Sequence, residues 1–302
     1  MEEPVALPDY RPRSIIRRLW NSDSRRRYFR STVGMASLIV VVALAVIAVV
    51  GPLLTMDPNH ADVLNILKPP SGKHWFGTDE LGRDVFARVI AGVRVSLVVS
   101  VVSTVIAVLI GMLVGSVSGF RGGVTDDVIS RIVDVLITFP TLLLGIVIAV
   151  VMGPSTTSIV VALSISQIPL YVRLFRAGSL TAKGTEYVMG ATALGLHPVR
   201  ILGRHIVPNT ITPVLVVAAG HVGRLAIAEA SLSYLGAGIQ QPNASLGNMI
   251  SEGQPYLQVN WWLPVIPGAV LMVLSVAFSF MGDALRDAFD VRESSVAQVA
   301  AA

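Results

Sequence analysis

Between residues 33 and 54 the chain reads VGMASLIVVVALAVIAVVGPLL and carries no charged side chain. As an α-helix rising about 1.5 Å per residue, a run of this length crosses roughly 30 Å of hydrocarbon. A secretory signal peptide would have a shorter apolar region followed by a small-residue cleavage site, whereas this run ends in Gly51-Pro52-Leu53-Leu54. The run therefore predicts a membrane-spanning helix that is retained.

Further apolar runs of similar length follow along the chain. The predicted spans are residues 33–54, 93–120, 132–152, 157–175, 212–235 and 263–281. Only 14% of the residues are charged and 53% are hydrophobic, whereas about 25% are charged in an average soluble protein. Because lipid offers the backbone no hydrogen-bond partners, each span must be helical. The sequence thus predicts an all-α membrane protein with six transmembrane helices.

Basic side chains are concentrated ahead of the first span, which holds eight of the 23 lysines and arginines: Arg11, Arg13, Arg17, Arg18, Arg25, Arg26, Arg27 and Arg30. They are typical of a cytoplasmic tail beside membrane lipid. No basic stretch is interleaved with aromatic residues in a recognisable module, so we expect no nucleic-acid partner. The chain has no cysteine, which excludes disulfides, thiolate zinc sites and iron–sulfur ligation.

The orientation of the chain in the membrane follows from the distribution of lysines and arginines among its connections. If the amino terminus is cytoplasmic, the connections on that side hold most of the lysines and arginines, as the positive-inside rule requires. Both termini are therefore predicted to be cytoplasmic. We expect an amino-terminal tail at 1–30, a first helix with an external segment at 31–92, a permease domain at 93–283 and a carboxyl-terminal tail at 284–302.

The cytoplasmic connection between the fourth and fifth spans is long. Its residues 186–209 read EYVMGATALGLHPVRILGRHIVPN. Gly195 is a good helix stop and Pro198 suits the first turn of another helix, so the pattern predicts a compact helix–turn–helix. Small residues at 190, 191 and 193 would leave a shallow surface for a protein partner, with polar contacts from His197, Arg200, Arg204 and His205. The alternative is a connector that binds nothing.

This stretch resembles the cytoplasmic signature of the inner-membrane permeases of ATP-binding-cassette (ABC) importers. Ala191, Gly195 and Pro208 stand at the spacing of that signature, while four positions depart from it: Met189, Gly190, His205 and Val207. The fuller pattern resembles the dipeptide and oligopeptide (peptide/nickel) permeases. HWFGTDELGRDVFAR at 74–88, EASLSYLG at 229–236 and GDALRD at 282–287 extend the likeness over about residues 33–290.

The resemblance implies a type I ABC importer permease fold in the cytoplasmic membrane of a prokaryote. It also implies a homologous second permease, two ATPase subunits or a heterodimeric ATPase, and an extracytoplasmic substrate-binding protein. Residues implied to contact the ATPase are Glu186, Tyr187, Ala191, Gly195, His197, Arg200, His205 and Pro208. The cargo stays open among dipeptides, oligopeptides, nickel, haem and related solutes.

We expect no enzymatic activity and no cofactor on this chain, with ATP and Mg²⁺ bound by the partner ATPases. A phosphate-binding loop needs G-x-x-x-x-G-K-[S/T], but Gly72-Lys73 is followed by His74 and residue 67 is leucine. The alternative function is a self-sufficient secondary transporter or channel. Such a protein should show inverted repeats, broken helices or ionisable groups in several spans.

Only the fifth span carries ionisable groups at depth, and these are costly in lipid unless they face a cavity or a partner. His221 and Arg224 share a helix face, whereas Glu229 is rotated away from them. We consider all three as residues of a translocation path. For Arg224 the alternative is an ion pair with the second permease, and for Glu229 it is a structural hydrogen bond near the external gate.

Charges of both signs alternate in residues 74–88, where acidic side chains lie three to five positions from arginines. This spacing favours a salt-bridged amphipathic helix at the interface over a catalytic carboxylate site. The five histidines lack ligand-spaced carboxylates, so no metal site is expected.

Overall fold

The computed structural model describes residues 22–289, within which no β-strand occurs apart from an isolated bridge between Thr78 and Asp84. The α-helices are α2 (Ser22–Arg30), α3 (Thr32–Leu54), α4 (Val85–Arg121), α5 (Gly123–Thr138), α6 (Thr141–Met152), α7 (Thr156–Lys183), α8 (Glu186–Ala193), α9 (Pro198–Ile201), α10 (Val207–Tyr234), α11 (Leu246–Gly253) and α12 (Trp262–Phe289). A π-helix, η2 (Leu202–Ile206), links α9 to α10, and two 3₁₀ turns are η1 (Val63–Asn65) and η3 (Gln254–Tyr256). The all-α prediction is confirmed. The expected tail arginines at 11, 13, 17 and 18 lie outside the described residues.

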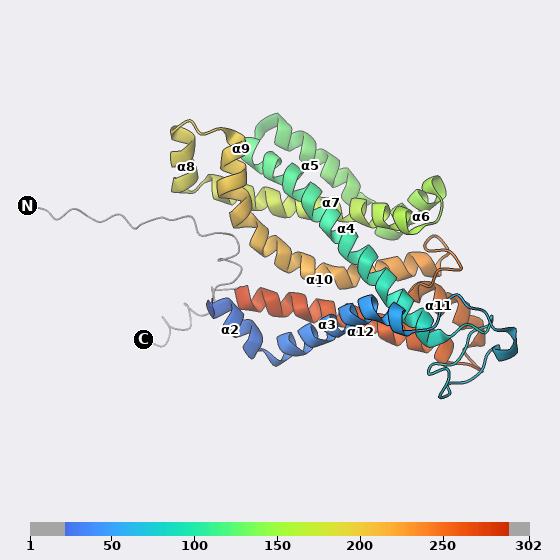
Figure 1. The fold of residues 1–302 in the computed structure, drawn as a ribbon. Helices are drawn as coiled ribbons and strands as arrows, with labels where there is room; N and C mark the ends of the chain where they lie inside the picture. The colour runs from blue at the N-terminus through green and yellow to red at the C-terminus, as the bar shows by residue number, and fades with distance from the viewer. Residues whose placement is uncertain (1–21, 290–302) are drawn as a thin grey trace, which may run out of the picture.

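The long helices lie alongside one another in a bundle (Figure 1). α4 packs along α7 and also contacts α3 and α10, while α12 packs against α3 and α10. α8 and α9 lie at one end of the bundle, together with α2 and the last turns of α12 (Figure 1). α11 and the segment between α3 and α4 lie at the opposite end. Both ends of the described chain are therefore on the same side as the connection between α7 and α10.

Five helices are long and apolar enough to cross a membrane by themselves or with their direct continuation: α3, α4, α7, α10 with α9 and η2, and α12. The second span begins at Val85 and not at residue 93. Asp84 explains the earlier start, because its Oδ1 accepts a hydrogen bond from the Ala87 amide at 2.8 Å and caps the helix.

The third span is not the continuous helix that the apolar run at 132–152 predicts. It is split into α5 and α6, which meet at an angle of 90°. The break lies at Phe139-Pro140, where proline disfavours helical geometry in the residue before it and Phe139 is extended. The six predicted spans are matched when this bent pair is counted as one.

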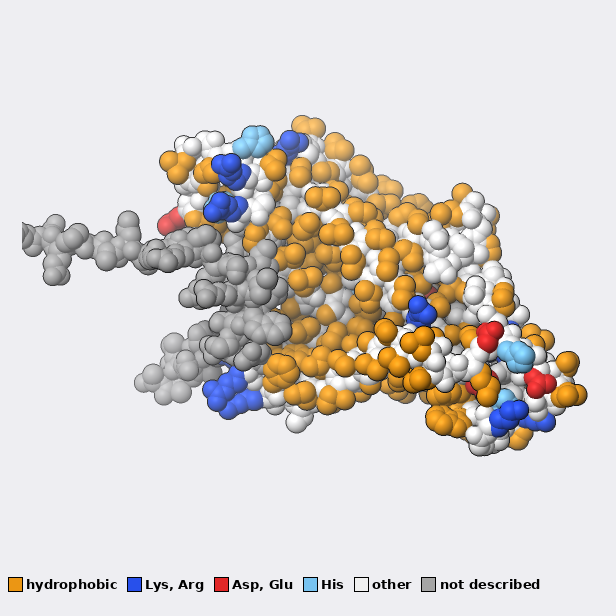
Figure 2. Space-filling model, in the orientation of Figure 1, with side chains coloured by type: hydrophobic (Ala, Val, Ile, Leu, Met, Phe, Trp, Pro, Cys, Tyr) orange, Lys and Arg blue, Asp and Glu red, His pale blue; other side chains and the backbone are white. Residues whose placement is uncertain are grey.

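The surface has the character expected of a protein in lipid. Hydrophobic side chains cover the middle of the face shown in Figure 2, and charged side chains gather mainly at its two ends. Exposed apolar side chains such as Val49 and Leu53 on α3, and Val150 on α6, point away from the bundle. The interior is packed by fully buried residues, including Leu163 and Phe175 of α7 and Leu274 of α12.

Candidate functional site

The connection from residue 184 to residue 209, called the 184–209 segment below, folds as the predicted helix–turn–helix. α8 ends at Ala193, Gly195 has a φ of +70°, and α9 begins at Pro198. A φ of this sign is unfavourable for residues with a Cβ, which explains glycine at this turn. His197 is the N-cap of α9, and its Nδ1 accepts from the Val199 amide at 3.4 Å.

The inner face of the segment packs against its own chain. Val188, Ala191, Ile201 and Ile206 are buried together with Ala182 of α7. Small residues at 190, 191 and 193 were expected to form one outward surface, but Ala191 is only 7% exposed. It supports the segment from inside, while residues 190 and 193 are exposed.

The outward face combines polar and apolar side chains. Of the residues predicted to contact an ATPase, Glu186, Gly195, His197 and Arg200 are exposed. Sequence reasoning missed the exposed apolar side chains of the same face, which are Met189, Leu194 and Val199. The sequence did contain a signal for this apolar surface, because Leu194 stands directly before the turn residue Gly195 in an otherwise polar loop.

Two other predicted residues brace the segment. The ring of Tyr187 on α8 lies 6.0 Å from that of His205 on η2, and the Tyr187 hydroxyl accepts from Asn209 Nδ2 at 2.8 Å. Asn209 Nδ2 also donates to the His205 carbonyl at 2.6 Å. Pro208 stands in the first turn of α10, where a missing amide hydrogen is tolerated. These contacts tie α8 to the start of α10.

Glu229 lies inside the bundle. Its side chain is fully buried and accepts hydrogen bonds from three hydroxyls, those of Ser96 on α4 at 2.6 Å, Ser233 at 3.0 Å and Ser245 at 3.0 Å. Ser245 is the N-cap of α11. The carboxyl group therefore joins α4, α10 and α11 through hydrogen bonds of the structural kind considered for Glu229.

His221 and Arg224 lie together, as their spacing predicts, and apart from Glu229. Arg224 Nη1 is 3.4 Å from His221 Nε2. Both line a cavity of about 170 Å³ between α10 and α12, to which Ser279, Asp283 and Arg286 of α12 also contribute. Within the described residues this cavity gathers polar groups from two membrane-spanning helices.

The predicted amphipathic helix at residues 74–88 is wrong for most of its length. Residues 74–84 form turns, and helix begins only at Val85. Gly77 and Gly82 have φ values of +75° and +74°, which a right-handed helix does not allow. The ion pairs inferred from the charge spacing do form, since Arg83 Nε donates to Asp79 Oδ2 at 2.6 Å.

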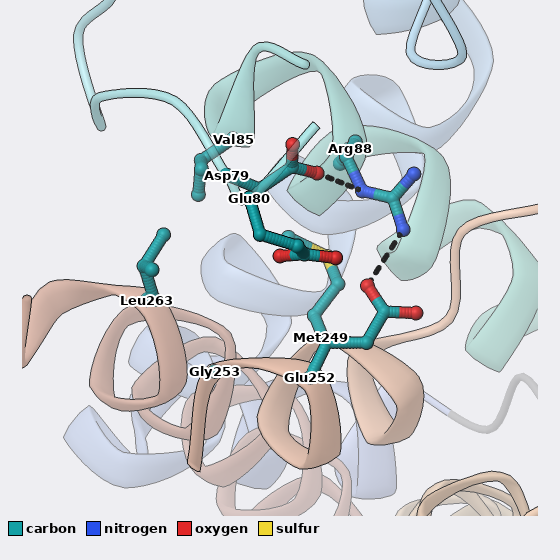
Figure 3. A pocket seen from close by; sticks show the side chains of 8 residues that line it. All are labelled: Asp79, Glu80, Val85, Arg88, Met249, Glu252, Gly253 and Leu263. Carbon is teal, nitrogen blue, oxygen red and sulfur yellow. Dashed lines mark hydrogen bonds and ion pairs between the residues drawn. The ribbon is translucent and has the colours of Figure 1, made fainter. Parts of the chain in front are cut away.

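The same ion pairs continue to α11 (Figure 3). Arg88 Nε lies 3.4 Å from Asp79 Oδ2 and Arg88 Nη2 lies 3.2 Å from Glu252 Oε2. Glu80 Oε1 accepts from Arg83 Nη2 at 3.2 Å, and burial raises the pKa of the Glu80 carboxyl. Oxygens of all three carboxylates lie within 4.8 Å of one another. Because guanidinium groups already occupy those oxygens, the cluster suits a joint between the segment before α4 and α11 better than a cation site.

Two family models match the chain. One is described as "Binding-protein-dependent transport system inner membrane component" and matches residues 107–294. The other is described as "N-terminal TM domain of oligopeptide transport permease C" and matches residues 18–70.

Curated relatives align over most of their own length. The oligopeptide transport system permease protein OppC of Bacillus subtilis (strain 168) is 39% identical over 273 residues, covering 90% of this chain and 89% of that protein. The probable D,D-dipeptide transport system permease protein DdpC of Escherichia coli (strain K12) is 37% identical over 261 residues, covering 86% of this chain and 88% of that protein.

Solved structures share the fold at low identity. A chain of the MetNI methionine ABC transporter, in an inward-facing conformation, matches with a TM-score of 0.53 at 21% identity, covering 67% of this chain and 96% of that one. A chain of an amino acid ABC transporter solved with histidines matches with a TM-score of 0.51 at 20% identity, covering 66% and 92%. They show the type I ABC importer permease fold. Together with the family models and the relatives, they establish that this chain belongs to the inner-membrane permeases of binding-protein-dependent ABC importers, in the dipeptide and oligopeptide branch.

Proposed function

We propose that the 184–209 segment is the docking element through which a separate ATPase drives this permease. The observation that carries the proposal is the two-helix fold itself. It is packed on its inner face and presents an outward face with Leu194 82% exposed beside the Gly195 turn. The exposed apolar side chains of Met189, Leu194 and Val199 share this face with Arg200, and a patch of this kind is typical of a protein interface.

The segment is well placed to transmit motion. α8 follows α7 after a short turn, and α9 continues through η2 into α10, so each side of the segment leads directly into a long helix. The brace between Tyr187, His205 and Asn209 holds α8 to the start of α10. A displacement of the segment would thus move two membrane-spanning helices together, as alternating access requires.

The remaining subunits follow from this division of labour. A homologous second permease would complete the translocation path, and two ATPase subunits or a heterodimeric ATPase would bind ATP and Mg²⁺. An extracytoplasmic binding protein would deliver dipeptides or oligopeptides, which the relatives' names favour as cargo. The 184–209 segment, α2 and the end of α12 would face the cytoplasm, with both ends of the described chain on that side (Figure 1).

Photo-cross-linking in intact cells tests the docking. The variant Leu194→p-benzoylphenylalanine should form an adduct with an ATPase subunit, identified by mass spectrometry after purification through a tag on this chain. The matched control is Val63→p-benzoylphenylalanine, because Val63 is similarly exposed, at 80%, at the opposite end of the molecule. An adduct of the Leu194 variant with the binding protein, or an ATPase adduct from the Val63 variant, would contradict the proposal.

A reconstitution separates the importer from the alternative of a self-sufficient transporter or channel. The complete complex should accumulate labelled peptide in liposomes only when ATP is supplied on the ATPase side. The chain alone should accumulate none. Uptake by the isolated chain would favour the alternative. The broken helix formed by α5 and α6 is a structural feature that also fits a secondary transporter.

A further inference from the structure

The polar cavity between α10 and α12 lies between two membrane-spanning helices, where burying a charged or polar group costs free energy. By the rise of an α-helix, Arg224 is about 15 Å from the end of α10 at Tyr234. A guanidinium at such depth requires a water-filled cavity or a partner. The cavity volume of about 170 Å³ is several times the ~30 Å³ that a water molecule occupies.

The floor of the cavity is a close contact between the two helices. A Cβ placed on Gly282 of α12 would lie 2.5 Å from the Cα of Gly220 on α10. The absence of side chains at these two positions brings the backbones together and leaves space beside them. Polar side chains from positions one or a few residues away border that space: His221, Arg224, Ser279, Asp283 and Arg286.

Each ring nitrogen of His221 faces a polar group. Its Nδ1 is 3.4 Å from Gln167 Oε1, which can only accept, and its Nε2 is 3.4 Å from Arg224 Nη1, which can only donate. Both contacts are satisfied by a neutral imidazole with its proton on Nδ1. In that form His221 orients Arg224 without adding charge to the cavity.

The charge of the cavity is unbalanced. Arg224 and Arg286 contribute two positive charges and Asp283 one negative charge. Within residues 22–289 neither arginine has a carboxylate at ion-pair distance. A cavity with a net charge of one positive unit becomes neutral when it accepts one monoanion, and the planar fork of a guanidinium matches a carboxylate.

We propose that this cavity holds the α-carboxylate of the transported peptide during its passage, with Arg224 as the principal contact and His221 as a positioning residue. The inference rests on the proposed import function and adds to it a requirement for a free carboxylate at the end of the peptide. A peptide in solution carries one carboxylate at its end, and that charge loses its water shell on entering the bundle. Arg224 and Arg286 replace that hydration.

The test compares trialanine with trialanine amide in the complete reconstituted complex with ATP. Both probes are supplied at concentrations that saturate the same wild-type binding protein. Arg224→Gln should lower trialanine uptake about tenfold, corresponding to about 1.4 kcal/mol, and should lower uptake of the amide much less. The ratio of the two rates, compared between wild type and variant, isolates the interaction between Arg224 and the carboxylate from any preference of the binding protein.

Arg173→Gln is the matched control, since Arg173 on α7 forms an exposed ion pair with Asp134 outside the cavity. It should leave both rates within about twofold. Size-exclusion chromatography and the subunit ratio of each purified complex show whether assembly is intact. If Arg224→Gln fails to assemble, Arg286→Gln at the exposed end of α12 carries the same comparison.

Equal losses for both probes would overturn the proposal and would point to an ion pair between Arg224 and the second permease. Uptake unaffected by either cavity variant would also overturn it. If the wild-type complex imports neither probe when ATP is present, the import function itself has failed, which is a different outcome from an unaltered ratio.

Discussion

Arg88 in the first turns of α4 and Glu252 near the end of α11 are 164 residues apart in the chain, yet Arg88 Nη2 donates to Glu252 Oε2 over 3.2 Å. The Arg88 side chain is fully buried, and the same Glu252 oxygen lies 3.4 Å from Arg83 Nη2. At its other end α11 is held by the hydrogen bond from Ser245 to Glu229. Both ends of this short helix are therefore fixed to the bundle.

Removing Arg88 should destabilise the folded chain strongly, because Asp79 and Glu252 lose a fully buried guanidinium and keep only Arg83 as a cationic partner among the described residues. Breaking a buried pair typically costs about 3–5 kcal/mol. Arg88→Ala should thus lower the apparent unfolding temperature of the purified complex by several degrees. Arg173→Ala breaks an exposed pair and should have a small effect, of about 0–1 kcal/mol. Similar shifts for the two variants would argue against a structural joint at Arg88.

The Glu80 carboxyl should make stability depend on pH. Burial raises its pKa above the ordinary value of 4.5. The negative charges of Asp79 and Glu252 add to this increase, and the positive charge of Arg83 reduces it. The folded state then binds the proton more tightly than the unfolded state, so stability falls as pH rises from about 4.5 through the folded-state pKa. The Glu80→Gln variant has no carboxyl group at this position, so its stability lacks this decrease with rising pH. The unfolding temperature of the variant minus that of wild type should therefore increase with pH, and a flat or decreasing difference would contradict this assignment.

Glu229 should be replaceable by glutamine but not by alanine. Glu229→Ala leaves the hydroxyls of Ser96, Ser233 and Ser245 without their acceptor, at about 1–3 kcal/mol for each buried group left unsatisfied. Glutamine keeps one acceptor oxygen for two of the serines and can donate to the third. Fluorescence-detected size-exclusion chromatography after heating should show Glu229→Gln close to wild type and Glu229→Ala well below it. The reverse order would show that the hydrogen-bond network has been misassigned.

Gly195→Val should impair transport more than insertion. A φ of +70° costs a β-branched residue about 1–2 kcal/mol or more, so the turn between α8 and α9 would shift and the docking face with it. Peptide uptake per assembled complex should fall while the amount of chain in the membrane stays near wild type. Gly153→Val is a matched control, because Gly153 has a φ of +81° and equally open surroundings in the turn before α7. Normal uptake by Gly195→Val would remove the docking role of this turn.

Much of the fold follows from the sequence because membrane spans have a strong local signal. The apolar runs predict α3, α7, α10 and α12, and Gly195 with Pro198 predicts the turn between α8 and α9. These signals are local, since they depend on the hydrophobicity of consecutive residues and on the backbone preferences of single residues. The start of α4 was also readable from Asp84, a common N-cap residue.

Other features depend on contacts between distant residues. The acidic and basic spacing around Asp79 and Arg83 suits a helix as well as a turn, whereas the turn depends on the positive φ of Gly77 and Gly82 and on a close backbone contact at Gly82. A Cβ there would lie 1.9 Å from the Asp62 carbonyl. The pairing of Arg88 with Glu252 has no local signal either. Nor does the sequence reveal that Arg286 of α12 joins Arg224 in one cavity.

Cysteine accessibility provides the most direct measurement of the central claim, because the chain has no cysteine of its own. Ala193→Cys places a thiol on the exposed face of the 184–209 segment, and Val63→Cys places one at the opposite end of the molecule. A membrane-impermeant maleimide added to intact cells should label Val63→Cys and spare Ala193→Cys, and inverted membrane vesicles should show the opposite pattern. Labelling of Ala193→Cys from outside intact cells would contradict the account, since no ATPase could then reach the segment.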